Sequence, residues 1–283
     1  MTLVGRDRHQ SELLCLLTRQ RLVTITGAGG AGKSALARAV AGRVGPGTVL
    51  VDLAGLGPGD GPGDRTAPPV PPWGGGPPPG LLVLDTCDRA IDACARLAED
   101  LLSALPDLRI LVTGRESLGL PGEHVVVAGP LPPADAAALF HRRSGGLAAD
   151  PGVLARLEGI PLAIEIAAEH LLDGPRLAAL LDTGVFLDLP AGPGHPARHA
   201  SLRTAAGWSR AQCQPADVRA WERLAGLAGP FRPEEAEWAL AAHGAHDPSE
   251  AVARLVERSI LLVERGPGGR WYRMPFHLRA FTK

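Results

Sequence analysis

Lysine is almost absent from this chain of 283 residues, in which Lys33 and Lys283 are the only lysines and arginine carries nearly all other basic charge. This scarcity indicates a coding bias that replaces lysine wherever arginine serves as well. Arginine does not serve where a compact point charge must reach into a loop, because its guanidinium is wide and forked. Position 33 is therefore a candidate for a site that requires lysine.

Other features are also missing, and each absence excludes a class of protein. The four cysteines are scattered without a Cys-x-x-Cys pair, so neither disulfides nor a zinc site is expected. The formal net charge is -1, which gives no overall attraction to nucleic acid or to a membrane surface. No apolar run resembles a signal peptide or approaches the length that crosses a bilayer. We therefore expect a soluble, cytoplasmic protein with no membrane partner.

Lys33 lies in an eight-residue motif, Gly27-Ala28-Gly29-Gly30-Ala31-Gly32-Lys33-Ser34, that fits G-x-x-x-x-G-K-[ST]. In such a phosphate-binding loop (P-loop), backbone N–H groups surround the phosphates of a nucleotide, the lysine reaches the β and γ oxygens, and the Ser34 hydroxyl binds Mg²⁺. The predicted nucleotide-binding residues here are Gly27, Gly29, Gly30, Ala31, Gly32, Lys33, Ser34 and Ala35.

The flanks of the motif supply the context that it needs. Residues 22–26 are a short apolar run typical of a buried parallel strand, and residues 34–41 predict a helix that ends at Gly42. The N-terminus of that helix would add partial positive charge toward the phosphates. The alternative, a glycine-rich turn that carries Gly-Lys-Ser by chance, does not explain these flanks.

Further apolar runs predict the rest of an α/β fold, a P-loop parallel sheet with helices on both faces. The predicted strands are 48–53, 81–85, 108–113 and 124–127. A helix over 88–105 would place Ile91, Ala95, Ala98, Leu102 and Leu105 on one face. Residues 56–80, rich in glycine and proline and with Trp73 as their only aromatic residue, predict a flexible loop, which we favour over a proline-rich partner motif.

Two charged residues are predicted at the strand ends where ligands collect in such sheets. Asp85 ends the 81–85 strand, and with the P-loop on a neighbouring strand we favour Mg²⁺ binding and a catalytic role, together with Lys33, over a simple helix cap. Arg115 follows the 108–113 strand, where a ligand contact and an ordinary surface position are both open.

The remainder of the chain is predicted to be mainly helical. The expected helices are 133–143, 153–157, 162–172, 175–181, 202–208, 216–227, 233–242 and 249–258. Strands over 260–263 and 270–274, joined by a turn at 266–269, complete the pattern of a winged helix. With a boundary in the Gly/Pro linker 191–195, the predicted domains are a P-loop domain (1–130), a small helical lid domain (131–192) and a winged-helix domain (196–283).

The winged-helix region also raises two alternatives, which its composition disfavours. Its arginines are interspersed with acids, as on a solvated surface, so direct DNA binding is not expected. The pairs His195/His199 and His243/His246 have metal-like spacing, but they lie in Gly/Pro/Ala-rich segments without cysteine, so metal binding is disfavoured.

Five motifs in this order resemble the NB-ARC type of STAND ATPases, which are signal-transduction NTPases, and in particular large transcriptional regulators of high-GC bacteria. The motifs are Val4-Gly5-Arg6, the P-loop, Leu82-Val83-Leu84-Asp85, Thr113-Gly114-Arg115-Glu116 and Gly159-Ile160-Pro161-Leu162-Ala163. The resemblance implies a switch that ADP holds closed and ATP opens for self-assembly into a homo-oligomer. It also implies that Val4 and Arg6 line the adenine pocket, Pro161 presses on the base and Arg115 senses the γ-phosphate.

The chain departs from the family pattern in three places. The loop 56–80 replaces a helix-containing stretch. Thr86 follows Asp85, so no adjacent acid activates water, and Asp88 is more typical of a helix cap; we expect slow or no hydrolysis. Met274-Pro275-Phe276 stands where relatives often place a histidine-containing tripeptide, and we do not assign a nucleotide-sensing role to His277.

Three other functions remain as alternatives to the switch. A P-loop ATPase or kinase with turnover as its purpose requires a general base and a second-substrate pocket, and the sequence indicates neither. A DNA-binding regulator requires a basic recognition helix, but residues 233–242 contain Glu234, Glu235 and Glu237. A degenerate switch that keeps the pocket without the cycle is the third.

Overall fold

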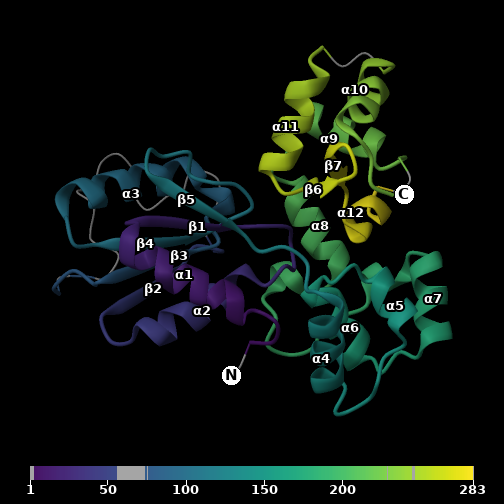
Figure 1. The fold of residues 1–283 in the computed structure, drawn as a ribbon, viewed down its shortest axis with the longest axis horizontal. Coiled ribbons are helices and arrows are strands. Elements are labelled where there is room, and N and C mark those ends of the chain that lie inside the picture. Colours follow the sequence, from purple (N-terminus) through teal and green to yellow (C-terminus); the bar gives the residue numbers. More distant parts are fainter. Residues whose placement is uncertain (1–2, 56–73, 75, 228, 244–245, 283) are drawn as a thin grey trace. The chain divides into compact units, whose positions relative to one another are not determined.

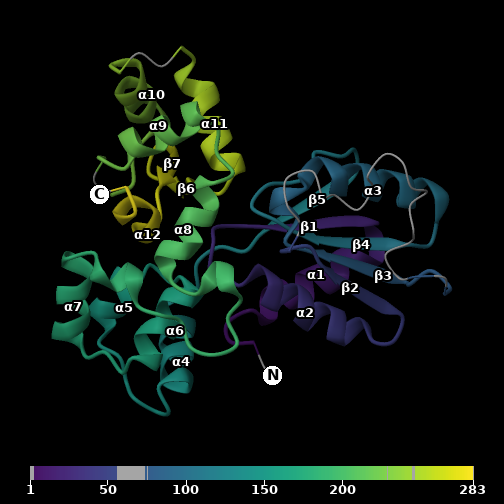
Figure 2. The ribbon, with the colours of Figure 1, turned by 180° about the vertical axis from the view of Figure 1, so that it is seen from behind.

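The computed structural model describes residues 3–55, 74, 76–227, 229–243 and 246–282. Most of the predicted flexible loop, including Trp73, lies outside the described residues. The chain forms two compact units, one made of residues 1–27 and 32–128 and the other of residues 28–31 and 129–283. Figures 1 and 2 show the elements from opposite sides, and each unit is described by itself.

The first unit is built on a five-stranded parallel sheet with the strand order β2-β3-β4-β1-β5. The strands are β1 (Leu22–Thr26), β2 (Thr48–Asp52), β3 (Leu81–Asp85), β4 (Arg109–Thr113) and β5 (Glu123–Val127). All residues of β1 and β3 are buried, as expected for strands covered on both faces. The α/β fold prediction is confirmed. The expectation that the Asp85 strand neighbours the P-loop strand is wrong, because β4 lies between β3 and β1; chain order does not fix the order of parallel strands.

Helices cover both faces of this sheet (Figure 1). They are α1 (Asp7–Arg19), α2 (Lys33–Val44) and α3 (Ile91–Ala104), with a short 3-10 turn at Cys87–Arg89. On one face, side chains of α3 pack on alternate residues of the central strands, such as Leu82 and Ile110. On the other, α2 packs against β3 and β4.

Two details of the helix predictions are wrong. Gly42 does not end α2, which continues to Val44 and stops before Gly45, whose φ of 92° ends the helix. The helix α3 begins at Ile91 rather than at residue 88; its most deeply buried residues are Cys94, Leu97, Ala98 and Leu101, and the predicted Ile91, Ala95, Leu102 and Leu105 are partly buried and pack against the same core. The 3-10 turn that precedes α3, entered through Thr86 at φ 67°, starts the helix later than predicted.

The second unit is helical apart from one hairpin. Its helices are α4 (Pro133–Arg143), α5 (Pro151–Arg156), α6 (Pro161–Glu169), α7 (Gly174–Asp182), α8 (Leu202–Arg210), α9 (Pro215–Leu224), α10 (Pro233–Ala241), α11 (Pro248–Glu257) and α12 (Phe276–Ala280), with 3-10 turns at Val185–Asp188 and Ala197–His199. Proline stands in the first turn of many of them, where its missing N–H costs nothing. No helix of the described residues is both long and apolar enough to span a membrane.

The hairpin consists of β6 (Leu262–Gly266) and β7 (Gly269–Arg273), which pair antiparallel. The predicted first strand was shifted, since Ile260 and Leu261 are buried before β6 begins. The predicted turn was too wide, because Gly266 pairs with Gly269. The core of this region contains the buried Trp221, whose indole N–H donates to the Leu278 carbonyl at 3.0 Å. The elements follow the order that a winged helix requires, but the winged-helix assignment and the boundaries of the three predicted domains stay predictions.

Candidate functional site

The loop between β1 and α2 has a backbone conformation that glycine permits. Gly27, Gly30 and Gly32 have φ values of 145°, 82° and 87°, a range that other residues rarely adopt. Gly32 is the residue before Lys33, which begins α2. The Lys33 ammonium donates a hydrogen bond of 2.6 Å to the carbonyl of Gly27. The lysine side chain thus folds back over the loop, close to where a P-loop places phosphates.

The second unit contains the middle of this loop and the motif that includes Pro161. The backbone N–H of Leu162 donates to the Gly30 carbonyl at 3.2 Å. A side chain at position 30 would come within 2.8 Å of the Leu162 Cβ, so glycine is required sterically as well. Pro161 occupies the first turn of α6, directly before the residue that contacts the loop.

Asp85 is fully buried at the end of β3 and is held by two other elements. Its Oδ1 accepts a hydrogen bond of 2.5 Å from the Thr113 hydroxyl on β4. Its Oδ2 is 2.9 Å from Nη2 of Arg38 on α2, and the same nitrogen is 3.7 Å from Asp52. The carboxylate therefore lies between the strand-end edge and the helix that follows the P-loop.

Arg115 forms a second charged pair at this edge. Its guanidinium is 3.3 Å from the carboxylate of Asp88, and its backbone N–H donates to the other oxygen of that carboxylate at 2.7 Å. Arg115 is only 6% exposed, so the surface alternative is wrong. The N-cap position of α3 is Ala90, two residues after Asp88, and the Asp88 carboxylate contacts both the backbone and the side chain of Arg115.

The remaining predicted residues are distributed over both units. Ser34 and Ala35 follow Lys33 in the first turn of α2, and Gly29 and Ala31 lie in the loop. Val4 and Arg6 lie just before α1, where Arg6 is buried, 2% exposed, and its carbonyl accepts from the Gln10 N–H.

The histidines noted in the sequence form no metal site among the described residues. His195 lies 3.7 Å from Glu165 and 4.0 Å from Glu169, while His243 pairs with the Ala239 carbonyl at 2.9 Å. His277 is fully buried in the first turn of α12.

Sequence reasoning missed two residues that contact Asp85. Thr113 gave a usable signal, since it is a polar residue at the end of a buried strand, as Asp85 is. Arg38 gave none, because only the packing of α2 against β3 brings an arginine on the helix to the strand end.

The side chains around the loop fit a nucleotide with its metal. Hydroxyl and carboxylate oxygens, such as those of Ser34 and Asp85, are the hard ligands that Mg²⁺ prefers. The glycine conformations and the lysine suit polyphosphate. Because the buried Thr113 hydroxyl holds one oxygen of Asp85, the carboxylate has a fixed position from which a metal-bound water could be reached.

The fold and this loop place the chain in the class of P-loop ATPase folds. The Walker-type ATPase PABY2304 of Pyrococcus abyssi has a similar structure, with a TM-score of 0.60 and 15% sequence identity over 99% of this chain and 96% of that protein. No protein-family model matches the chain.

Sequence comparison with curated proteins identifies the family. The chain is 31% identical over 325 aligned residues to the "Uncharacterized protein Rv0894" of Mycobacterium tuberculosis, covering 99% of this chain and 80% of that protein. The chain belongs to the family of Rv0894. It is also 32% identical to the "Putative HTH-type transcriptional regulator Rv0890c" of the same organism, over 94% of this chain, but it spans only 34% of that protein's length.

Proposed function

We propose that this chain binds ADP and ATP with Mg²⁺ and acts as a nucleotide-dependent switch of the NB-ARC type within transcriptional regulation. The observation that carries the proposal is the loop 27–34, with glycine at its positive-φ positions and Lys33 folded over it. The similarity to an HTH-type regulator supports the regulatory context, although that relative is about three times as long.

The ion pair between Arg115 and Asp88 supports a switch rather than an enzyme with rapid turnover. Asp88 is the nearest carboxylate to Asp85 in sequence, and Arg115 engages it. A carboxylate in an ion pair is a poor base for activating water, so hydrolysis is slow or absent. The γ-phosphate of ATP offers Arg115 a stronger partner than Asp88, and ADP does not. Arg115 would therefore pair with Asp88 when ADP is bound and with the γ-phosphate when ATP is bound. This change of partner would make the protein respond to the difference between the two nucleotides.

The contact between Leu162 and Gly30 supports coupling of the nucleotide site to the rest of the chain. In the proposed closed form, Val4 and Arg6 contact the adenine and Pro161 packs on the base. The lid domain (131–192) and the winged-helix domain (196–283) would follow the nucleotide state, and ATP would favour a homo-oligomer. DNA contact through α10 is disfavoured, because the exposed Glu234, Glu235 and Glu237 would repel phosphates.

The first experiment is to denature the purified protein and resolve the released nucleotides chromatographically. Near-stoichiometric ADP supports a closed switch. The Lys33→Ala variant should release little nucleotide, and Arg43→Ala, an exposed change in the last turn of the same helix, should match the parent. An empty parent protein that also fails to bind Mg²⁺-ADP and Mg²⁺-ATP on titration would overturn the proposal.

A further inference from the structure

A cavity lies in the helical unit, within the region of α9, α10 and α11. Its volume is about 740 Å³, within the range of small-molecule binding sites. Its apolar lining comes from Ala216 and Ala220 of α9, Leu240 of α10 and Ala251 of α11. Small side chains on two of the three helices leave the space open.

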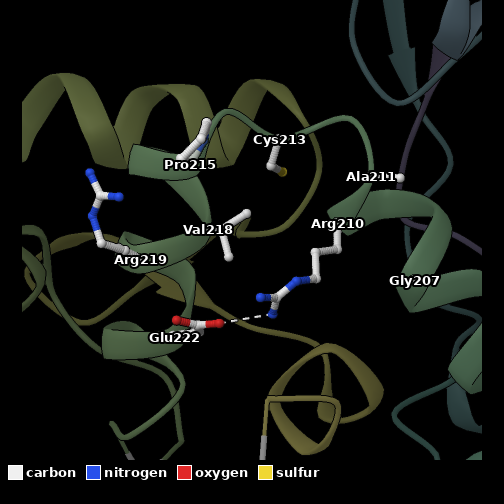
Figure 3. A pocket seen from close by; sticks show the side chains of 8 residues that line it. All are labelled: Gly207, Arg210, Ala211, Cys213, Pro215, Val218, Arg219 and Glu222. Atoms are coloured by element: carbon white, nitrogen blue, oxygen red, sulfur yellow. Dashed lines mark hydrogen bonds and ion pairs between the residues drawn. The ribbon is translucent and has the colours of Figure 1, made fainter.

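Most acidic side chains of the cavity wall already have cationic partners. Glu222 forms an ion pair of 2.8 Å with Arg210, and Glu250 forms one of 2.9 Å with Arg254. Figure 3 shows the neighbouring hollow of about 510 Å³, which shares Arg219 and Glu222 with this cavity. In that view Glu222 points toward Arg210, and Arg219 points away from the pair.

The remaining acid, Asp247, is held by the start of α11. Its carboxylate accepts from the Glu250 backbone N–H at 2.9 Å, and this hydrogen bond lowers the pKa of Asp247. Its negative charge therefore interacts with the helix N-terminus, where a carboxylate is stabilised.

Two arginines of the wall remain without such partners. Arg219 and Arg223 are exposed and lie one turn apart on α9, and neither forms an ion pair with any residue that the structure describes. Like charges at this spacing repel each other on a helix. His243 and His246 add further polar groups to the same wall.

We propose that this cavity binds a small anionic molecule, whose phosphate or carboxylate group pairs with Arg219 and Arg223 and whose apolar part packs on Ala220 and Leu240. An anion between the arginines relieves their repulsion, and the forked guanidinium matches both kinds of oxyanion. The site belongs to the second unit and does not depend on nucleotide at the P-loop. It would give the protein a ligand other than ATP and ADP.

The test is a fluorescence titration with 8-anilinonaphthalene-1-sulfonate, an anionic apolar probe, in the Lys33→Ala background so that the P-loop does not contribute. The double variant Arg219→Ala/Arg223→Ala should bind the probe at least about tenfold more weakly, as loss of one hydrogen bond to a charged group predicts. The control Arg265→Ala/Arg270→Ala removes two arginines from the exposed hairpin and should not change binding.

A second variant and two competitors separate charge from shape. Ala216→Trp, a change at an exposed position of the cavity wall, should also weaken binding of the probe, because the larger side chain fills part of the cavity without altering its charge. Displacement by pyrophosphate identifies a phosphate ligand, and displacement by citrate identifies a carboxylate. Unchanged affinity in the arginine double variant, an equal loss in the hairpin control, or displacement by neither anion would overturn the proposal.

Discussion

Each unit of this protein contains a fully buried aspartate held by arginine, and the two sites differ in how their partners are fixed. Asp85 at the end of β3 and Asp217 in α9 are both 0% exposed. Asp85 pairs with Arg38 at 2.9 Å and accepts from Thr113 at 2.5 Å. Asp217 pairs with Arg254 at 2.7 Å and with Arg258 at 2.9 Å.

The partners of Asp217 are themselves anchored, whereas the charged partner of Asp85 is not. Arg258 also donates to the Gln212 carbonyl, and Arg254 also pairs with Glu250. The side chain of Arg38 is 52% exposed, and the one other acid that it reaches among the described residues is Asp52, at 3.7 Å. Burial of a carboxylate therefore does not identify a functional group by itself. Asp85 differs from the structural Asp217 because its charged partner, Arg38, is exposed enough for water or a metal ion to take its place beside the carboxylate.

The largest expected effect is on the structural site. Asp217→Ala leaves two arginines without their buried partner, so the free energy of unfolding should fall by about 3 kcal/mol. Urea unfolding measures it, and Glu257→Ala, an exposed change on α11, should leave stability nearly unchanged. Equal stability of the Asp217 variant and the parent would show that the anchored arginines do not make Asp217 a structural site.

Asp85→Asn should reverse this pattern, with a small loss of stability and a large loss of metal-dependent binding. The amide keeps the shape but loses the charge, so Mg²⁺-dependent nucleotide affinity should fall about 10- to 100-fold, as for groups that orient a metal's ligands. Titration with and without Mg²⁺ measures it. The control Asp52→Asn changes the other acid near Arg38. If both variants lose the metal effect equally, Asp85 has no special role.

Glu158 is an intermediate case, a carboxylate that accepts from the Phe276 N–H at 2.9 Å and lies 3.9 Å from Arg273. Burial raises the pKa of Glu158 above its ordinary value of 4.5. The folded state then holds this proton to higher pH than the unfolded state, so its contribution to stability decreases as pH rises from 4.5 through the raised pKa.

Glu158→Gln should remove that pH dependence, because the amide keeps a hydrogen-bond acceptor without a titrating charge. The free energy of unfolding, measured from pH 4 to pH 7, should decline less with pH in the variant than in the parent. Glu237→Gln, an exposed change on α10, is the control. An unchanged slope in Glu158→Gln would contradict the assignment.

The smallest effect is expected at an exposed pair, Asp188 and Arg203, whose side chains are 52% and 44% exposed. Asp188→Asn should lower the free energy of unfolding by less than about 1 kcal/mol, and added salt should reduce the difference further, because water and ions screen the pair. A loss as large as that of Asp217→Ala would show that burial is not what separates these sites.

Much of the fold could be predicted because the relevant signals are local. Short apolar runs bounded by glycine and polar residues gave all five strands of the parallel sheet, and proline at helix starts located helices such as α4. Errors arose where a local signal was ambiguous. Gly42 resembles a helix end, but the chain stays helical until Gly45, where φ becomes positive. The start of α3 depended on the turn before it, which no periodicity reveals.

The sequence by itself determined the class of the protein, because Lys33 within a run of glycines has a chemical purpose that few other contexts share, and it named Asp85 and Arg115 from their positions after apolar strands. Only the tertiary structure decided what these charges touch. Arg38 reaches Asp85, Asp88 fixes Arg115, and Arg219 with Arg223 forms part of a cavity wall, because packing joins groups that are distant along the chain. Which groups a charged side chain contacts depends on tertiary packing, and the local sequence pattern carries little information about that packing.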